Sequence, residues 1–413
     1  MIRDPVRRHV KLPECRSRFL MRACPWRRPT LLTAVLTAVL TMASMALRPA
    51  IAEPGAKSTA MRPPPRAPLL ALVRPVVAPL PAAVTNNAVA RLCRKGRPVL
   101  VSFMGLGAAK RWRDITRAAH AYEFGQGKWR RLPDVPVPQG RIAATAVGIG
   151  GTALLFGGYS VATDGHEVSE PEVFRFDIET NRWTMRAPMP LPVDDSVSGV
   201  LDERYVYLVS GWHDDGNVPD VQIYDSHEDR WTKATPFPGR PVFGHAGGLV
   251  GRTLVVIDGV AVVGRDEQGR RRFRLVRQAW RGDIDPDDPR RIRWRRIADH
   301  PGPPVYRAGA TALPENGWVL FAGGGLRAYN YDGIGYDGVP AEASARVFAY
   351  DVKSDRWYDL GRMAQPSMDH RALIAGKRGF HLVGGMDADR KVRRQVTGFI
   401  LPDASPSPCR TGG

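Results

Sequence analysis

The sequence predicts an all-β fold, a six-bladed β-propeller with an N-terminal signal segment. The chain of 413 residues contains 42 glycines and 36 prolines, which favours many short strands joined by turns. Hydrophobic residues make up 43% of it, enough to bury a large core. One strand-rich unit also recurs along the chain, with a period typical of propeller blades.

The repeat unit places an aromatic residue seven positions before a tryptophan. An acidic residue follows the aromatic one each time, and four pairs have this spacing: Tyr122 and Trp129, Phe176 and Trp183, Tyr224 and Trp231, Tyr350 and Trp357. Pairs of small residues, such as Gly157-Gly158, end the preceding apolar strand. Each unit should form a four-stranded sheet that buries its aromatic rings against the neighbouring blades. These aromatic residues are therefore expected to be structural.

Residues 80–401 resemble the kelch-repeat family on this pattern. Within it, residues 100–107 and 321–333 are most similar to bacterial sialic-acid mutarotases, also called N-acetylneuraminate epimerases. The resemblance implies a sugar isomerase with a Glu and an Arg after the small-residue pair of blade four. Val260 stands where the Glu is expected, and Arg265 is the candidate for the Arg. The sequence therefore leaves open whether the chain is an enzyme.

Strand counting predicts how the ring of blades closes. Units two to five are complete, whereas the last unit, residues 369–401, lacks the tryptophan strand. Residues 88–93 should form the inner strand of blade one. We expect residues 80–84 to supply the missing outer strand of blade six, since Pro79 and Pro81 are tolerated at a sheet edge.

The N-terminus predicts export. Residues 1–52 combine many arginines with an uncharged run at 31–47 and an Ala-x-Ala cleavage site at 50–52. Residues 53–79 are rich in proline and are expected to form a linker, and residues 402–413 a C-terminal tail. The pattern predicts a periplasmic or secreted protein that leaves the membrane once its signal is cleaved.

Charge and motif content argue against several function classes. The formal net charge is +19, but no recognition-helix pattern accompanies it, so no nucleic-acid partner is expected. Asp283, Asp285 and Asp287 imitate a calcium loop, yet Asp288 replaces the required glycine and Trp294 the closing glutamate. We expect no metal and no cofactor.

Galactose-oxidase-like chemistry remains a remote alternative. That copper enzyme shares the kelch fold but depends on a cysteine cross-linked to a tyrosine inside the propeller. Here no cysteine lies between Cys93 and Cys409.

One mouth of the channel is the predicted binding face. Because neighbouring strands alternate in direction, the loops between the second and third strands of all blades open on one side. Three of these loops are long, at 159–171, 212–220 and 326–343. Long loops gathered on one face are typical of a functional surface.

The first residues of the inner strands should ring this mouth together with residues of the long loops. We expect seven of them to bind ligand: Arg141, Tyr159, Trp212, His213, Arg307, Tyr331 and Arg371. We expect the acid or base of an isomerisation among four others: Asp195, His245, Asp369 and His370. Asp194, Tyr329 and Asp387 belong to the same ring.

This mixture of residue types suits an acidic sugar or a cell-surface glycan. Arginine pairs with a carboxylate, acids accept hydroxyl groups, and aromatic rings stack on sugar rings. We expect Arg307 and Arg371 to be exposed to solvent. A non-catalytic propeller that binds a glycan or a protein is the alternative.

The cysteines predict one disulfide. Cys15 and Cys24 lie in the signal segment, so the exported part keeps only Cys93 and Cys409. The eight residues from Leu401 to Cys409 span up to about 26 Å, enough to reach the end of the first inner strand. An oxidising compartment would allow the pair to form.

Export has a direct test. Mass spectrometry of the native protein should find an N-terminus near Glu53, because cleavage is expected after Ala52. Recovery of an intact chain from Met1 or Met21 in the cytosol would contradict export.

Overall fold

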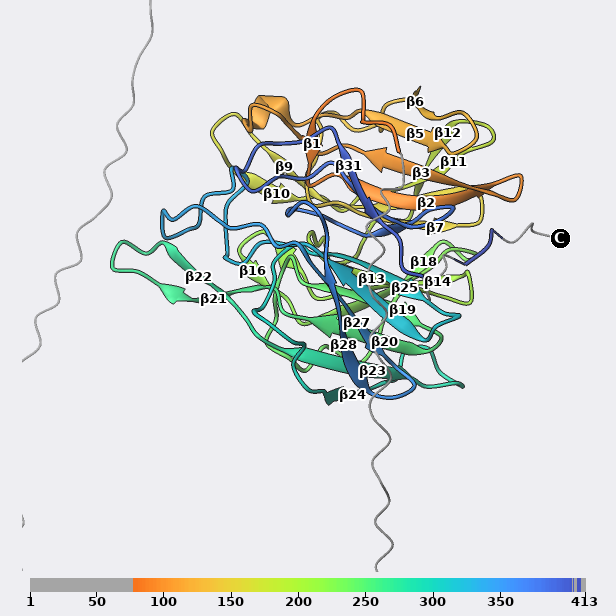
Figure 1. The fold of residues 1–413 in the computed structure, drawn as a ribbon. Helices are drawn as coiled ribbons and strands as arrows, with labels where there is room; N and C mark the ends of the chain where they lie inside the picture. The colour runs from red at the N-terminus through yellow and green to blue at the C-terminus, as the bar shows by residue number, and fades with distance from the viewer. Residues whose placement is uncertain (1–76, 403, 405–406, 410–413) are drawn as a thin grey trace, which may run out of the picture. The chain divides into compact units, whose positions relative to one another are not determined.

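Six antiparallel β-sheets surround a central channel (Figure 1). The structure is a computed structural model that describes residues 77–402, 404 and 407–409. The predicted signal, most of the linker and part of the tail lie outside these residues. Within them, no helix is long and apolar enough to cross a membrane, and a single 3₁₀ turn occurs, η1 (Trp112–Asp114).

The blades follow the predicted repeat, and the six-bladed propeller is confirmed. Blades one to five each have four strands, which run from the channel outward as β2 (Ala88–Arg94), β3 (Arg97–Phe103), β5 (Ala119–Glu123) and β6 (Lys128–Leu132); β7 (Thr145–Ile149), β8 (Thr152–Phe156), β11 (Val173–Asp177) and β12 (Arg182–Arg186); β13 (Val197–Leu201), β14 (Tyr205–Val209), β17 (Val221–Asp225) and β18 (Arg230–Lys233); β19 (Ala246–Val250), β20 (Thr253–Ile257), β23 (Ala279–Ile284) and β24 (Ile292–Arg296); β25 (Gly309–Leu313), β26 (Trp318–Ala322), β27 (Arg346–Asp351) and β28 (Arg356–Arg362). Blade six has three: β29 (Ile374–Ala375), β30 (Phe380–Val383) and β31 (Val396–Phe399).

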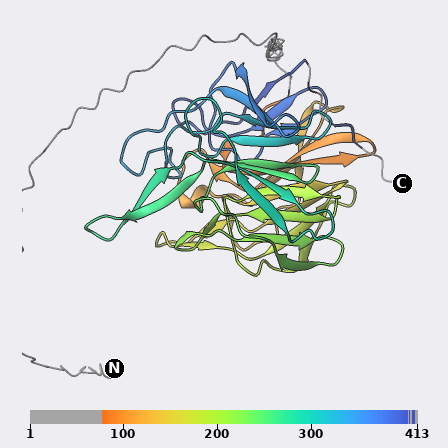
Figure 2. The ribbon, with the colours of Figure 1, turned by 90° about the horizontal axis from the view of Figure 1, so that it is seen from below.

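The connections between second and third strands carry short strands of their own. These are β4 (Leu106–Gly107), which pairs with β1 (Val84–Thr85), and the hairpins β9 (Tyr159–Val161) with β10 (Glu167–Ser169), β15 (Trp212–His213) with β16 (Gly216–Asn217), and β21 (Val260–Arg265) with β22 (Arg271–Leu275). They lie on the left in Figure 1, the face called the mouth below. In Figure 2 the hairpin β21–β22 projects furthest from the propeller.

The conserved spacing of the repeat reflects strand register. The tryptophan of each outer strand lies directly opposite the aromatic residue of the third strand, as Tyr224 and Trp231 do. In blade four Gly282 takes the aromatic position, and a side-chain carbon there would lie 2.7 Å from the ring of Trp294. The large ring of Trp294 therefore requires the glycine opposite it.

Each of these tryptophans also ties its blade to the preceding one. The indole N–H donates to a backbone carbonyl just beyond the preceding outer strand, at 2.7–3.3 Å: Trp129 to Ala78, Trp183 to Pro133, Trp231 to Ala187, Trp294 to Thr235, and Trp357 to Ala298. Four of the five acceptors follow the outer strand of the preceding blade. The fifth, Ala78, belongs to the N-terminal segment and takes the corresponding place beside blade six.

The ring closes through this N-terminal segment, but without the expected regular strand over residues 80–84. The backbone N–H of Leu80 donates to Arg394 at 2.7 Å, and that of Val84 to Arg393 at 3.1 Å. Pro79 and Pro81 have no N–H to donate, so a continuous ladder cannot form. The segment therefore covers the edge of blade six with two backbone hydrogen bonds and with the buried side chain of Leu80.

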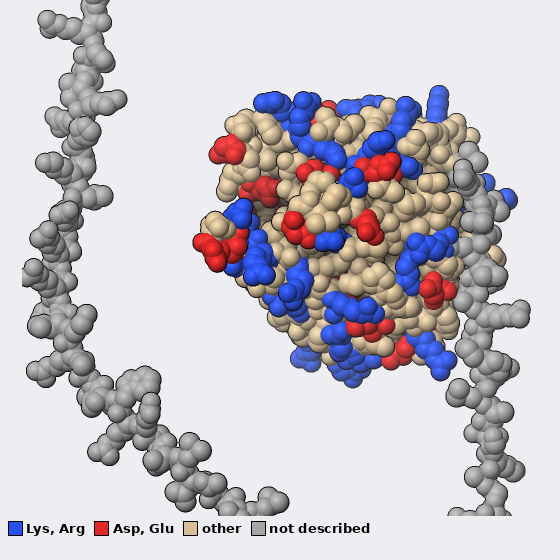
Figure 3. All heavy atoms as spheres, turned by 60° about the vertical axis from the view of Figure 1, so that its left-hand side comes forward, with Lys and Arg blue, Asp and Glu red and all other residues tan. Residues whose placement is uncertain are grey.

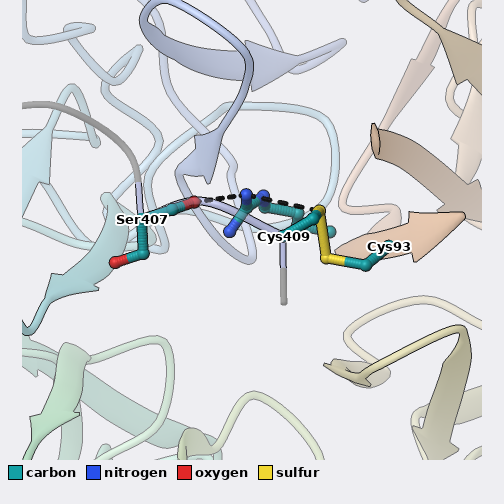
Figure 4. Close-up of a disulfide and its surroundings, with 4 residues drawn as sticks. Cys93, Ser407 and Cys409 are labelled. Carbon is teal, nitrogen blue, oxygen red and sulfur yellow. Dashed lines mark hydrogen bonds between the residues drawn. A yellow bond between two sulfur atoms is a disulfide. The ribbon is translucent and has the colours of Figure 1, made fainter. Parts of the chain in front are cut away.

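A disulfide joins the C-terminal tail to blade one on the face opposite the mouth (Figure 4). Cys93 near the end of β2 bonds Cys409, with 5.5 Å between their Cα atoms. The guanidinium of Arg91 donates to the carbonyl of Ser407 at 2.5 Å and to the sulfur of Cys409 at 3.5 Å. The tail is thus held at the lower end of the channel, where Ser407 contributes to the lining.

The disulfide should contribute measurably to stability. It links residues 316 positions apart, and a bridge that closes so long a loop typically contributes about 2–4 kcal/mol. Cys409→Ser should lower the melting temperature, and the Cys93→Ser/Cys409→Ser double variant should match it. Equal melting of wild type and both variants, with or without reductant, would contradict this role.

Candidate functional site

Six equivalent residues, one from each blade, meet at the mouth in the left-handed backbone conformation. Their φ angles lie between 51° and 69°: Asn86, Ala143, Asp195, Gly244, Arg307 and Asp369. Hydrogen bonds from one blade to the next link several of them, including Gly244 N–H to Asp195 at 3.0 Å and Arg307 N–H to Gly244 at 2.7 Å. This conformation is unfavourable for residues other than glycine, so the neighbouring blades must hold it in place.

Side chains from this ring form a buried ion cluster of Asp195, Arg307, Asp369 and Arg371. Arg307 donates to both oxygens of Asp195 and, at 2.9 Å, to Asp369. Arg371 also pairs with Asp195. Burial alone would raise the pKa of Asp195, but the charges of Arg307 and Arg371 outweigh it and hold the pKa below its ordinary value.

The ion cluster overturns one expectation. Arg307 and Arg371 were expected to be exposed, but each side chain is only 4% exposed. Tyr329 and Thr85 occupy further acceptor sites of Asp369, at 3.2 and 2.5 Å. Two arginines and two aspartates therefore balance one another, and neither arginine is an unpaired cation facing solvent.

A cavity of about 230 Å³ lies above the ion cluster on the mouth side. Asp195 and Arg307 form its floor, and the long connections form its walls. The wall residues are Tyr159, Glu167, Asp194, Trp212, Phe243, Arg271, Phe273, Tyr329, Asn330, Tyr331 and Tyr336. We call it the mouth cavity.

Aromatic rings in mutual contact make one side of the mouth cavity. Trp212 lies 5.2 Å from Phe243 and 6.0 Å from Phe273, between ring centres. Phe273 stacks on Tyr336 at 4.0 Å. The guanidinium of Arg271 lies 5.0 Å above the Trp212 ring. Such rings pair flat apolar faces with a cation at the rim.

Two carboxyl groups in the mouth cavity have no arginine partner in the described part of the chain. The hydroxyl of Ser169 donates to Asp194 at 2.8 Å. Burial raises the pKa of Asp194 well above its usual range, and the charges of Asp195 and Glu167 raise it further. Burial within the cavity raises the pKa of Glu167 also, although Arg307 and Arg271 partly oppose this.

The structure brings only part of the predicted ring to this cavity. Tyr159, Trp212, Tyr331, Asp194 and Tyr329 line it. Asp195, Arg307, Asp369 and Arg371 form the ion cluster. The other side chains point elsewhere: Arg141 pairs with Glu172 at 2.8 Å, His213 contacts the carbonyl of Pro192 at 2.8 Å, and Asp387 pairs with Arg393 at 3.0 Å.

His245 and His370 are buried beside the inner strands, not in the mouth cavity. His245 contacts the carbonyl of Val209 at 2.8 Å and lines the channel below the ion cluster. His370 contacts the hydroxyl of Ser367 at 2.8 Å. Burial lowers the pKa of His245 to about 4 and that of His370 to about 3, so both rings are neutral at pH 7.

Sequence reasoning missed Glu167, Arg271, Phe273 and Tyr336. Three of them lie on connections whose length marked them as candidates, but a single acid or ring within a loop carries no periodic signal. The connection at 260–275 forms the hairpin β21–β22 and was not recognised as a mouth loop. Val260 is buried in this hairpin, and Arg265 lies at its exposed end, away from the mouth cavity.

Comparisons with known proteins agree with the repeat architecture. The kelch motif model matches residues 140–190. Kelch-like protein 15 of Gallus gallus is 34% identical over 26% of this chain, and Kelch-like protein 34 of Homo sapiens is 26% identical over 60%. The matched regions span 22% and 43% of those relatives' lengths.

A solved structure, that of YjhT, has the same fold. It superposes on 81% of this chain and 99% of its own, with a TM-score of 0.63 and 16% sequence identity. Together with the motif, these findings support membership of the kelch-repeat proteins. Among the described residues, no group of three or more His, Cys, Asp or Glu side chains is arranged to hold a metal ion.

The ion cluster should dominate the stability of the mouth. Arg307→Ala leaves Asp195 and Asp369 buried with less compensation, which should lower the free energy of unfolding by about 3–5 kcal/mol. Arg295→Ala removes an exposed pair with Asp355 and should cost at most about 1 kcal/mol. Urea unfolding measures both; equal small losses would contradict a structural role for Arg307.

Proposed function

We propose that the protein is an exported kelch propeller that binds an acidic sugar, free or as part of a glycan, in the mouth cavity. The observation that carries this proposal is the pairing of aromatic walls with two carboxyl groups, Glu167 and Asp194, that no arginine neutralises. Aromatic faces stack on sugar rings, and the carboxyl groups exchange hydrogen bonds with sugar hydroxyls.

Arg271 supports the acidic character of the sugar. Its Nη2 group pairs with the exposed carboxylate of Asp215 at 2.5 Å, while its buried Nε has no hydrogen-bond partner within the described residues. Buried donors are normally paired, so an unpaired one beside a cavity favours a bound acceptor. We assign the sugar carboxylate to Arg271 and not to Arg307 or Arg371, whose charges the ion cluster balances.

Isomerisation of the bound sugar is the second candidate function, as the resemblance to sialic-acid mutarotases implies. Opening a sugar ring needs one group to accept the proton of the anomeric hydroxyl and another to protonate the ring oxygen. Asp194, whose raised pKa favours the protonated form, suits the acid, and Glu167 suits the base. Asp195 and Asp369 are engaged by arginines, and His245 and His370 lie outside the cavity, so we do not assign them these roles.

Export fits the disulfide as well as the predicted signal. A bond between Cys93 and Cys409 persists in an oxidising compartment and would be reduced in most cytosols. We therefore propose that the propeller works in the periplasm or outside the cell.

An NMR titration of the mature protein tests binding and isomerisation together. The sugars are N-acetylneuraminic, glucuronic and galacturonic acids, with glucose as the neutral comparison. We expect at least one acidic sugar to bind, and Trp212→Ala and Glu167→Gln to weaken its binding tenfold or more, because each removes a wall contact. Arg295→Ala, on the side of the propeller, should leave affinity unchanged.

The same spectra report exchange between the anomers. If the protein is an isomerase, it should accelerate this exchange, and Asp194→Asn should abolish the acceleration. Binding without acceleration would leave a non-catalytic sugar-binding propeller. Failure of all three acidic sugars to bind better than glucose would contradict the proposed function.

A further inference from the structure

A second, larger depression lies beside the mouth cavity, between the hairpin β21–β22 and residues 326–337. Its volume is about 910 Å³, roughly four times that of the mouth cavity. Arg271, Phe273 and Tyr336 line both. The stacked rings of Phe273 and Tyr336 therefore stand at the boundary between the two. We call this depression the arginine groove.

The arginine groove is strongly basic. Six arginines and two aspartates are among its lining residues: Arg265, Arg270, Arg271, Arg272, Arg274, Arg327, Asp266 and Asp337. Figure 3, which brings the mouth side forward, shows arginine and lysine gathered on the left and lower parts of this face with acidic side chains between them. The groove thus carries an excess of positive charge.

Three of these arginines have no carboxylate partner. Arg270 pairs with Asp266 at 2.8 Å, and Arg327 pairs with Asp337 at 2.5 Å. Arg272 and Arg274 form no ion pair with any described residue. The third, Arg265, donates only to the carbonyl of Gly269, at 2.8 Å. Unpaired cations that line a depression are available to an anionic ligand.

The unpaired charges are spaced along a strand. Arg272 and Arg274 are two positions apart in β22, so they project from the same side, about 6.6 Å apart. Arg271 and Phe273 project from the other side, toward Trp212. A spacing of this order matches successive sugars of a glycan better than one compact anion.

Exposed aromatic residues accompany the charge. Only five large hydrophobic side chains are exposed in the described part of the chain, and three belong to the loop beside the groove: Tyr331 (38%), Tyr336 (42%) and Val339 (45%). Exposed apolar side chains that gather at one place usually mark a binding surface. Rings beside unpaired arginines are suited to sugar faces with acidic substituents.

We propose that the arginine groove binds an acidic polysaccharide whose terminal sugar occupies the mouth cavity. This inference rests on the proposed sugar site and extends it from a single sugar to a chain. The chain would pass the Phe273–Tyr336 stack, and its following acidic groups would contact Arg272 and Arg274. The two aspartates in the groove accept sugar hydroxyls but would repel the denser charge of nucleic acid.

The experiment compares monomers with hexamers by calorimetry on the mature protein. The probes are galacturonic acid and its hexamer, N-acetylneuraminic acid and its α2,8-linked hexamer, neutral maltohexaose, and single-stranded DNA of twelve nucleotides. We expect one acidic hexamer to bind at least tenfold more tightly than its own monomer. The difference should shrink as salt concentration rises, because the added contacts are exposed charges.

Charge-matched variants locate the effect. Arg272→Ala/Arg274→Ala should remove most of the advantage of the hexamer and leave the affinity of the monomer unchanged. Arg175→Ala/Arg293→Ala removes the same charge from exposed positions on β11 and β24 and should leave both affinities within twofold of wild type. All variants should melt at the wild-type temperature, since the four side chains are exposed.

The outcomes separate this inference from the proposed function. Monomer binding without any advantage of the hexamer overturns the groove and keeps the mouth cavity. Equal binding of DNA and acidic hexamer overturns the groove as a polysaccharide site and leaves a general polyanion surface. Absence of monomer binding contradicts the proposed function itself.

Discussion

The ion cluster of Asp195, Arg307, Asp369 and Arg371 is the interaction on which the mouth of this propeller depends. Residues of three blades meet there, each brought in by a backbone conformation that is unfavourable on its own. Buried charges are tolerated only when they are paired. The cluster therefore couples the positions of the blades to one another, and it separates the mouth cavity from the channel, which Arg371 lines on the other side.

This constraint explains why adjacent aspartates differ in character. Asp195 points into the ion cluster, where two arginines favour its ionised form. Asp194 pairs by its backbone with Trp212 and turns its carboxyl group toward Ser169 and the cavity, where no cation compensates its burial. Because the floor of the cavity balances its own charges, recognition is left to the wall residues. Those walls belong to the connections between strands, which tolerate variation better than the blades do.

The repeat made the propeller predictable, whereas the site was only partly so. The aromatic-to-tryptophan spacing reports strand register, as in Tyr224 opposite Trp231, and this local pattern recurs in every complete blade. Strand direction correctly brought Asp194, Tyr159 and Trp212 to one mouth. The pairing of Arg307 with Asp195 joins residues 112 positions apart and depends on backbone angles that no periodicity encodes. Glu167 has no counterpart in other repeats, so only the folded hairpin β9–β10 reveals its place.

The most direct test of this account is the titration of Asp194 and Asp195 by carbon-13 NMR of their carboxyl groups, assigned with Asp194→Asn. An ordinary aspartate titrates near pH 3.9. The account predicts that Asp195 stays ionised below that pH, and that Asp194 takes up its proton well above it. Titration of both groups near the ordinary value, or a reversal of their order, would contradict a charge-balanced floor beneath a cavity with a protonated acid.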